Sequence, residues 1–165
     1  KPKKIEEHRK DPRLTKGPII VSIDTSGSMS GQPQRIAFSL LKQLLRMAKK
    51  QKRPCYLISF SVRSKSIDLA KPRNWGKIDS FLEHSFSGGT DGEQMLAEAI
   101  HVLQKGTYEM ADVLIISDFE FPVPNTSTME KINKEKTLGT RFYGLKIGHY
   151  GVKGYRHIMD KIWEV

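Results

Sequence analysis

Closely spaced oxygen-bearing side chains follow the first apolar segment of the chain. In IIVSIDTSGSMSG, residues 19–31, a run of β-branched residues ends at Asp24, and Ser26 and Ser28 follow at alternate positions. Alternation turns the three side chains of a roughly extended turn to one side, and Gly27 lets the backbone bend between them. A carboxylate beside several hydroxyls is a ligand set for a hard cation such as Mg²⁺ or Mn²⁺ and a poor one for Zn²⁺.

Two further oxygen ligands stand at comparable places in the sequence. Thr90 lies in the loop SGGTDG, and Asp118 ends the apolar run VLIISD. If the two apolar runs are neighbouring parallel strands, Asp24 and Asp118 face one crevice, where two carboxylates repel each other unless a cation lies between them. Two carboxylates and a few hydroxyls leave about one position of an octahedral shell open for water or a partner's carboxylate. We therefore predict a Mg²⁺ site, with Mn²⁺ as the substitute ion, formed by Asp24, Ser26, Ser28, Thr90 and Asp118.

Alternating strand and helix patterns position these side chains. Short apolar runs predict strands at 19–24, 54–62, 65–70, 111–119, 141–148 and 161–165. The second and third are close enough in sequence to form a hairpin. Amphipathic or capped segments predict helices at 33–51, 75–84, 93–106, within 122–139, and at 155–160.

This order of elements predicts an α/β fold. Strands that alternate with helices form βαβ units, so we expect a doubly wound, mostly parallel, Rossmann-like sheet flanked by helices, with one short antiparallel edge strand. The carboxyl ends of the parallel strands then share one edge, where ligands of such folds bind. Residues 1–16 are charged and carry two prolines, and they are predicted as a basic linker or arm ahead of a domain over 17–165.

Composition limits the setting in which the chain works. The 165 residues include 28 Lys and Arg against 18 Asp and Glu, a net charge of +10, which permits attraction to nucleic acid, anionic lipid or an acidic protein. The single cysteine, Cys55, excludes an internal disulfide, reads as a buried apolar residue and suits a reducing cytosol. No segment approaches the roughly 20 apolar residues that span a bilayer. We expect a cytoplasmic location, with peripheral contact at an anionic inner membrane as a further expectation.

The segments DTSGSM, SGGTD and LIISDF, in this order, resemble the metal-ion-dependent adhesion site of von Willebrand factor A domains. The resemblance covers nearly the whole chain after Gly17 and implies metal contact, direct or through water, by the five residues named above. VSIDTSGSM and LIISDFEFP resemble more closely the bacterial cytosolic members that work with a MoxR-type AAA+ ATPase. The resemblance implies a Mg²⁺-dependent protein-interaction module, a chaperone-like adaptor or modulator of such an ATPase or its client. Separately, we expect no enzymatic activity.

Apolar side chains near the predicted site are candidates for contact with a partner. Met29 follows the Asp24 turn, and Phe119 and Phe121 flank the site after Asp118, so we predict these three as partner-binding residues. Glu120 lies between the two phenylalanines and is expected to point away from the ion.

Two other functions remain alternatives at this point. A Mg²⁺-dependent phosphotransferase or phosphatase also uses an aspartate at a strand end, but the haloacid dehalogenase type needs a second acid two residues later, where Ser26 stands. The chain has no G-x-x-x-x-G-K-[ST] loop and no G-x-S-x-G motif, so no catalytic residue is assigned. A basic domain for nucleic acid or anionic lipid is the other alternative, although no aromatic residues are interleaved with the basic ones for nucleic acid.

Overall fold

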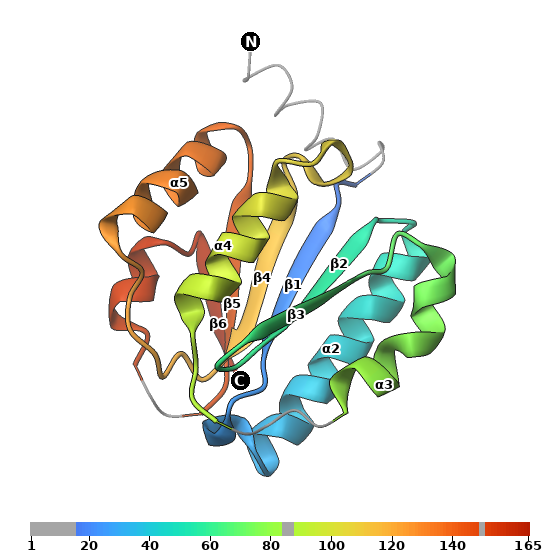
Figure 1. Ribbon diagram of the computed structural model, residues 1–165, viewed down its shortest axis with the longest axis horizontal. Coiled ribbons are helices and arrows are strands. Elements are labelled where there is room, and N and C mark those ends of the chain that lie inside the picture. The colour runs from blue at the N-terminus through green and yellow to red at the C-terminus, as the bar shows by residue number, and fades with distance from the viewer. Residues whose placement is uncertain (1–15, 84–87, 149–150) are drawn as a thin grey trace.

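Six strands form one sheet in the computed structural model, which describes residues 16–83, 88–148 and 151–165 (Figure 1). The strand order is β3–β2–β1–β4–β5–β6, and every neighbouring pair is parallel except β2 and β3. The predicted mostly parallel sheet with one antiparallel edge strand is thus confirmed. The strands are β1 (Ile19–Asp24), β2 (Cys55–Phe60), β3 (Ser64–Asp68), β4 (Asp112–Ser117), β5 (Arg141–Lys146) and β6 (Lys161–Glu164).

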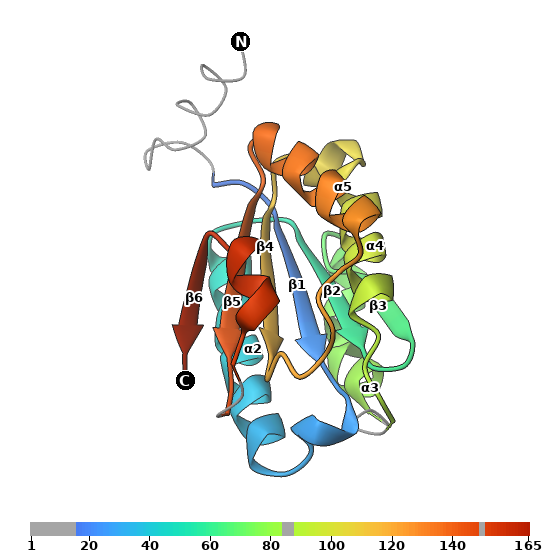
Figure 2. The same cartoon turned by 90° about the vertical axis from the view of Figure 1, so that its left-hand side faces the viewer.

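Helices cover both faces of the sheet, as two perpendicular views show (Figures 1 and 2). The α-helices are α2 (Gln32–Lys50), α3 (Ile78–Leu82), α4 (Gly92–Leu103) and α5 (Thr126–Thr137). Short 3₁₀ segments are η1 (Gly27–Met29), η2 (Pro72–Lys77), η3 (Gly106–Tyr108) and η4 (Lys153–His157). In the described part of the chain, no helix has the length and apolar character that a bilayer crossing requires.

The sheet separates two apolar cores, which explains why its central strands are apolar on both faces. In β1, Ile20 packs into the core beneath α4 and α5, while Val21 and Ile23 pack into the core beneath α2. All six residues of β1 are buried. A strand buried on both faces reads as a continuous β-branched run rather than as an alternating pattern.

Side chains cap the first turns of α4 and α5. The Asp91 carboxylate accepts a hydrogen bond from the Gln94 amide (3.0 Å) at the start of α4, and the Asn125 side chain accepts one from the Thr128 amide (2.8 Å) at the start of α5. These bonds satisfy backbone donors that a first helical turn leaves free. The helix predicted at 155–160 is instead the 3₁₀ segment η4, which ends with an i→i+3 bond from the Ile158 amide to the Tyr155 carbonyl (3.0 Å).

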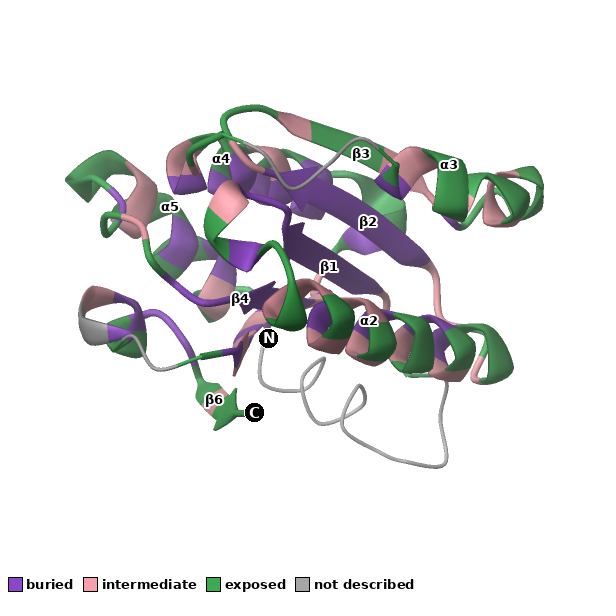
Figure 3. Cartoon of the chain, turned by 90° about the horizontal axis from the view of Figure 1, so that it is seen from below, coloured by how far each residue is buried: buried purple, intermediate pink, exposed green. Residues whose placement is uncertain are grey.

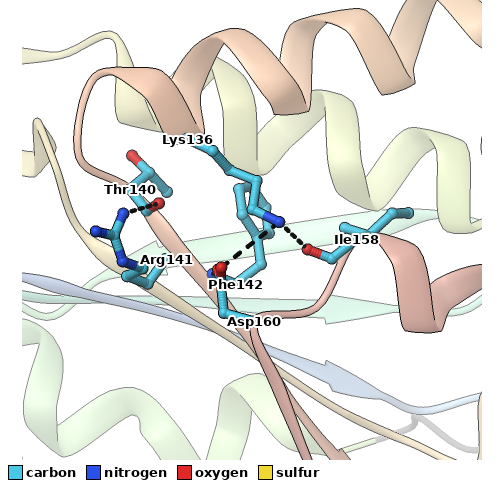
Figure 4. Close-up of polar contacts among 6 residues, drawn as sticks. All are labelled: Lys136, Thr140, Arg141, Phe142, Ile158 and Asp160. Carbon is cyan, nitrogen blue, oxygen red and sulfur yellow. Dashed lines mark hydrogen bonds and ion pairs between the residues drawn. The ribbon is translucent and has the colours of Figure 1, made fainter.

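A polar network fastens α5 to the last two strands (Figure 4). The Lys136 ammonium donates to the Ile158 carbonyl (2.5 Å) and lies 3.7 Å from the Asp160 carboxylate. The other carboxylate oxygen of Asp160 accepts from the Phe142 amide (2.8 Å) at the start of β5. This network positions the chain between η4 and β6, at the edge of the sheet opposite to the predicted metal site.

Candidate metal centre

The candidate site lies where the two central parallel strands end. β1 pairs with β4, so the carboxyl end of β1 at Asp24 lies beside the end of β4 and the following Asp118. Figure 3 looks onto this edge of the sheet. Asp24 has no exposed surface and Asp118 is 4% exposed. Strand order changes direction between β1 and β4, which is where ligands bind in open α/β sheets.

The turn after β1 gathers three of the predicted ligands. One oxygen of the Asp24 carboxylate accepts a hydrogen bond from the Ser26 amide (2.9 Å). The hydroxyl oxygens of Ser26 and Ser28 lie 3.2 Å apart. Ser26 is buried and Ser28 is exposed, so this oxygen cluster runs from the interior to the surface.

The loop that carries Thr90 is fastened against this turn. The Gly27 amide donates to the Gly88 carbonyl (3.0 Å), and the Asp91 amide donates to the Ser61 carbonyl after β2 (2.6 Å). A Cβ atom at residue 27 would lie 3.3 Å from the Gly88 oxygen, so the close approach favours glycine there. The half-buried Thr90 lies between these two anchors.

Ser117 links the two carboxylate-bearing turns. Its hydroxyl donates to the second oxygen of Asp24 (2.5 Å) and accepts from the Phe119 amide (2.8 Å). Asp118 accepts from the Glu120 amide (3.0 Å), which folds the chain tightly after β4. The sequence interpretation missed Ser117, although a hydroxyl at the last position of an otherwise apolar strand was a usable signal.

The electrostatics of this cluster suit a cation. Burial raises the pKa of Asp24, the hydrogen bonds from Ser117 and Ser26 oppose this effect, and the charge of Asp118 adds to it. Among the described residues, no Lys or Arg contributes to the pKa of Asp24. The buried Asp24 carboxylate therefore lies near enough to Asp118 to be affected by its charge, and the described groups that shift its pKa include no cation. A bound divalent ion would relieve this costly arrangement.

The donor chemistry fits Mg²⁺. The described residues contain no group of three or more His, Cys, Asp or Glu side chains that could hold a metal ion. The candidate set instead combines two carboxylates with three hydroxyls, all hard oxygen donors. Asp24, Ser26, Ser28, Thr90 and Asp118 are the residues that would hold the ion.

Two of the three residues predicted to contact a partner, Met29 and Phe119, have their side chains in the core, so the prediction of surface contact is wrong for them. Met29 has no exposed surface and packs in the core beneath α2. Phe119 is 4% exposed, its backbone adopts the left-handed region (φ 57°), and its ring packs against Tyr155 on the other side of the sheet. Phe121 is half-buried and makes a T-shaped contact with Tyr155. Of these three residues, only Phe121 is partly exposed, and the neighbouring Glu120 is exposed.

The thiol of Cys55 lies away from the candidate site. Cys55 is 1% exposed at the start of β2, at the opposite edge of the sheet, and burial raises the pKa of its thiol to about 12. The prediction that Cys55 is a buried apolar residue is confirmed. The His84 and His149 side chains fall outside the described residues, and His101 and His157 are exposed.

We predict that Ser117→Ala weakens Mg²⁺ binding about fivefold, because a bond of about 1 kcal/mol that orients the Asp24 carboxylate is lost. Ser22→Ala is the matched control: Ser22 is a buried serine of β1 whose hydroxyl has no hydrogen-bond partner within the described ranges. Isothermal titration with Mg²⁺ measures both variants. Equal affinities in the two variants would show that Ser117 does not position Asp24.

Curated bacterial proteins are similar to this chain in sequence. The sequence is 33% identical to the regulatory protein ViaA of Edwardsiella ictaluri and 31% identical to that of Proteus mirabilis, each over 157 residues. Both alignments cover 94% of this chain and 32% of the relative, so the chain spans about a third of the length of the curated relatives that it matches. No family model matches the sequence.

Solved structures identify the fold. The chain is similar to a von Willebrand factor type A protein from Catenulispora acidiphila, with a TM-score of 0.65 and 15% sequence identity. The alignment covers 92% of this chain and 39% of that chain. At this level of identity the similarity establishes a shared fold, and the ligands and partners of this chain require separate arguments.

Proposed function

Because the chain has the von Willebrand factor A fold and is similar to ViaA regulatory proteins over 94% of its length, we propose that it is a regulatory adaptor that docks a protein partner through Mg²⁺. The observation that carries this proposal is the pair of buried carboxylates, Asp24 and Asp118, at adjacent strand ends, with no Lys or Arg among the described groups that shift the pKa of Asp24. The hydroxyls of Ser26 and Ser28 lead from this pair to the surface.

Each residue has a distinct part in the proposed docking. Asp24 is held on one oxygen by Ser117 and on the other by the Ser26 amide, so its carboxylate is fixed before any ligand arrives. Ser28, which is exposed, marks the side from which a partner approaches. When bound, Mg²⁺ supplies an electrophilic centre with an open position for a carboxylate of the partner.

The partner that we propose is a MoxR-type AAA+ ATPase of the RavA kind, or a client of that ATPase. Support comes from the similarity to relatives named as regulatory proteins, since regulation requires a partner to act on. A carboxylate that completes the metal shell gives directional binding, while the loops around it select the partner.

We propose a cytoplasmic, non-enzymatic role, with peripheral contact at an anionic membrane through α2. This helix has five exposed basic side chains and no acidic residue: Arg35, Lys42, Arg46, Lys49 and Lys50. Such a surface attracts anionic lipid headgroups by a salt-dependent force.

Partner binding in the presence and absence of metal tests the proposal. With the MoxR-type ATPase of the same organism immobilised for interferometry, we expect the chain to bind at least tenfold more tightly in 5 mM Mg²⁺ than in EDTA, because the metal forms part of the contact. Raising the salt concentration with Mg²⁺ present separates metal-dependent docking from attraction between charged surfaces. Equal affinity in Mg²⁺ and in EDTA would contradict metal-dependent docking.

We also expect Mg²⁺ to raise the melting temperature of the isolated chain. A ligand at about 100 times its Kd that binds only the native state adds about 2.7 kcal/mol to the free energy of unfolding. For a domain of this size, that increase corresponds to roughly 5–10 °C. Differential scanning fluorimetry with Mg²⁺, Mn²⁺ and EDTA measures the shift, and an unchanged melting temperature with both ions would contradict the metal site.

A further inference from the structure

An exposed apolar side chain lies directly beside the loop that carries Thr90. Val62, in the turn between β2 and β3, is 55% exposed. A Cβ atom at residue 88 would lie 3.0 Å from the Val62 Cγ2 atom, so Val62 rests against the same glycine whose carbonyl accepts from Gly27. Figure 1 shows this turn at the edge of the sheet where β1 ends.

A polar pocket begins at the next residue. Arg63, Ser64, Gln94, Ala97 and Glu98 line a shallow pocket of about 440 Å³ between the start of β3 and α4. Gln94 lies in the first turn of α4, and its side-chain oxygen accepts from the Ser64 amide (2.6 Å). The pocket is therefore fastened to the helix that begins two residues after Thr90.

Several hydrogen-bond donors in this pocket are available to bind a ligand. Among the described residues, the exposed Arg63 guanidinium takes part in no ion pair, and the Ser64 hydroxyl has no hydrogen-bond partner. Since the Gln94 oxygen is already used, its amide N–H groups are the part left for a ligand. These donors suit a carboxylate, which accepts a bidentate hydrogen bond from arginine.

Arg63 is the one cationic residue among the residues that line the pocket. Glu98 is the one acidic residue among the residues that line it, and its Oε2 atom accepts from the Tyr56 hydroxyl (3.0 Å) and the Ser66 hydroxyl (3.2 Å). These bonds hold the Glu98 charge toward β2 and β3. Asp91 lies beside Ser61, and its carboxylate is engaged as the cap of α4, where it accepts from the Gln94 amide (3.0 Å). The chain from Thr25 to Ile67 contains no Asp or Glu.

We propose that Val62, Arg63, Ser64 and Gln94 form a second contact surface, which takes an acidic segment of the partner with an apolar residue between two acidic ones. One carboxylate of the segment reaches the metal, the apolar side chain covers Val62, and the second carboxylate binds Arg63. This inference rests on the proposed function, because the first carboxylate needs the Mg²⁺ site. It adds the sequence character of the partner segment and the residues of this chain that select it.

Peptide binding to the full chain tests this surface. The probes are fluorescein-labelled, N-acetylated peptides containing Glu-Leu-Glu, Gln-Leu-Gln or Glu-Ser-Glu within the same glycine–serine frame, measured by fluorescence polarisation in Mg²⁺ and in EDTA. We expect Glu-Leu-Glu to bind at least fivefold more tightly than the other two in Mg²⁺. Arg63→Gln and Val62→Ser should each weaken its binding at least threefold while leaving the Mg²⁺-induced melting shift unchanged.

Controls separate this inference from the proposed function. Leu138→Ser alters a side chain that is 51% exposed at the end of α5, and Lys131→Gln removes an exposed charge of the same helix, so both should bind as the wild type does. If Arg63→Gln and Val62→Ser bind like these controls while Asp24→Asn loses binding, the second surface is wrong and metal-dependent docking stands. If no peptide binds the wild-type chain in Mg²⁺, the second surface is overturned, and the ATPase assay above judges the metal site separately.

Discussion

We expect Asp24→Ala to abolish the proposed Mg²⁺-dependent docking, with a loss of at least a hundredfold in affinity for the partner in 5 mM Mg²⁺. The substitution removes one of two carboxylates at the candidate site, and hydroxyls alone do not offset the charge of a divalent ion. It also leaves Ser117 and the Ser26 amide without their acceptor. Interferometry against the ATPase and isothermal titration with Mg²⁺ measure the two consequences.

Asp24→Asn separates charge from shape in this experiment. The amide oxygen can still accept a hydrogen bond from the Ser26 amide, so the fold is retained while the negative charge is lost. Because burial raises the pKa of Asp24, the carboxylate destabilises the metal-free fold, and the variant should melt in EDTA at least as high as the wild type does. Full partner binding by either variant would contradict the account.

The same pKa shift gives a pH dependence with a definite sign. In the unfolded chain the Asp24 carboxyl loses its proton near its ordinary pKa of 3.8, whereas in the metal-free fold it does so at a higher pH. The fold therefore binds more protons in this window, and its stability falls as pH rises through it. Asp24→Asn lacks this titrating carboxyl. In EDTA, the free energy of unfolding of the variant should therefore increase relative to that of the wild type as pH rises from the unfolded-state pKa to the folded-state pKa.

We expect Ile116→Asp to unfold the chain. Ile116 has no exposed surface and lies in β4 between Ile23 of β1 and Leu145 of β5. A carboxylate at this place loses its water without gaining a partner, and the core loses a side chain worth several kcal/mol on its own. The combined loss, about 5 kcal/mol or more, is comparable with the whole stability of a small domain.

Circular dichroism and urea unfolding measure this loss. Ile116→Val is the matched control, because it removes one methylene group and keeps the strand propensity, at a cost of about 1 kcal/mol. Retention of a cooperative melting transition by Ile116→Asp, near the temperature at which the control melts, would contradict the placement of Ile116 in the core.

Particular residues show why so much of the fold is predictable from the sequence. Apolar runs such as IIVSID and VLIIS predict strands buried on both faces, and helices between them require parallel pairing. The antiparallel β3 follows from its short connection to β2. Capping by Asp91 and Asn125 is local in sequence, so residue type alone indicates it.

The interpretation was weaker where local backbone geometry decides where a side chain points. Met29 and Phe119 lie next to predicted ligands, yet the 3₁₀ turn η1 and the left-handed backbone at Phe119 place both side chains in the core. Proximity in sequence to a site does not fix which way a side chain points. Ser117 was missed for a related reason: its role depends on a contact with Asp24 across neighbouring strands.

Anomalous diffraction from crystals grown with Mn²⁺ tests the proposed metal site most directly. Mn²⁺ takes the same oxygen ligands as Mg²⁺, and its anomalous scattering shows where it is bound. The account predicts one strong anomalous peak at the carboxyl edge of β1 and β4, bounded by Asp24, Ser26, Ser28, Thr90 and Asp118 and missing from crystals of Asp24→Asn. A wild-type map without a peak among these side chains, at millimolar Mn²⁺, would contradict it.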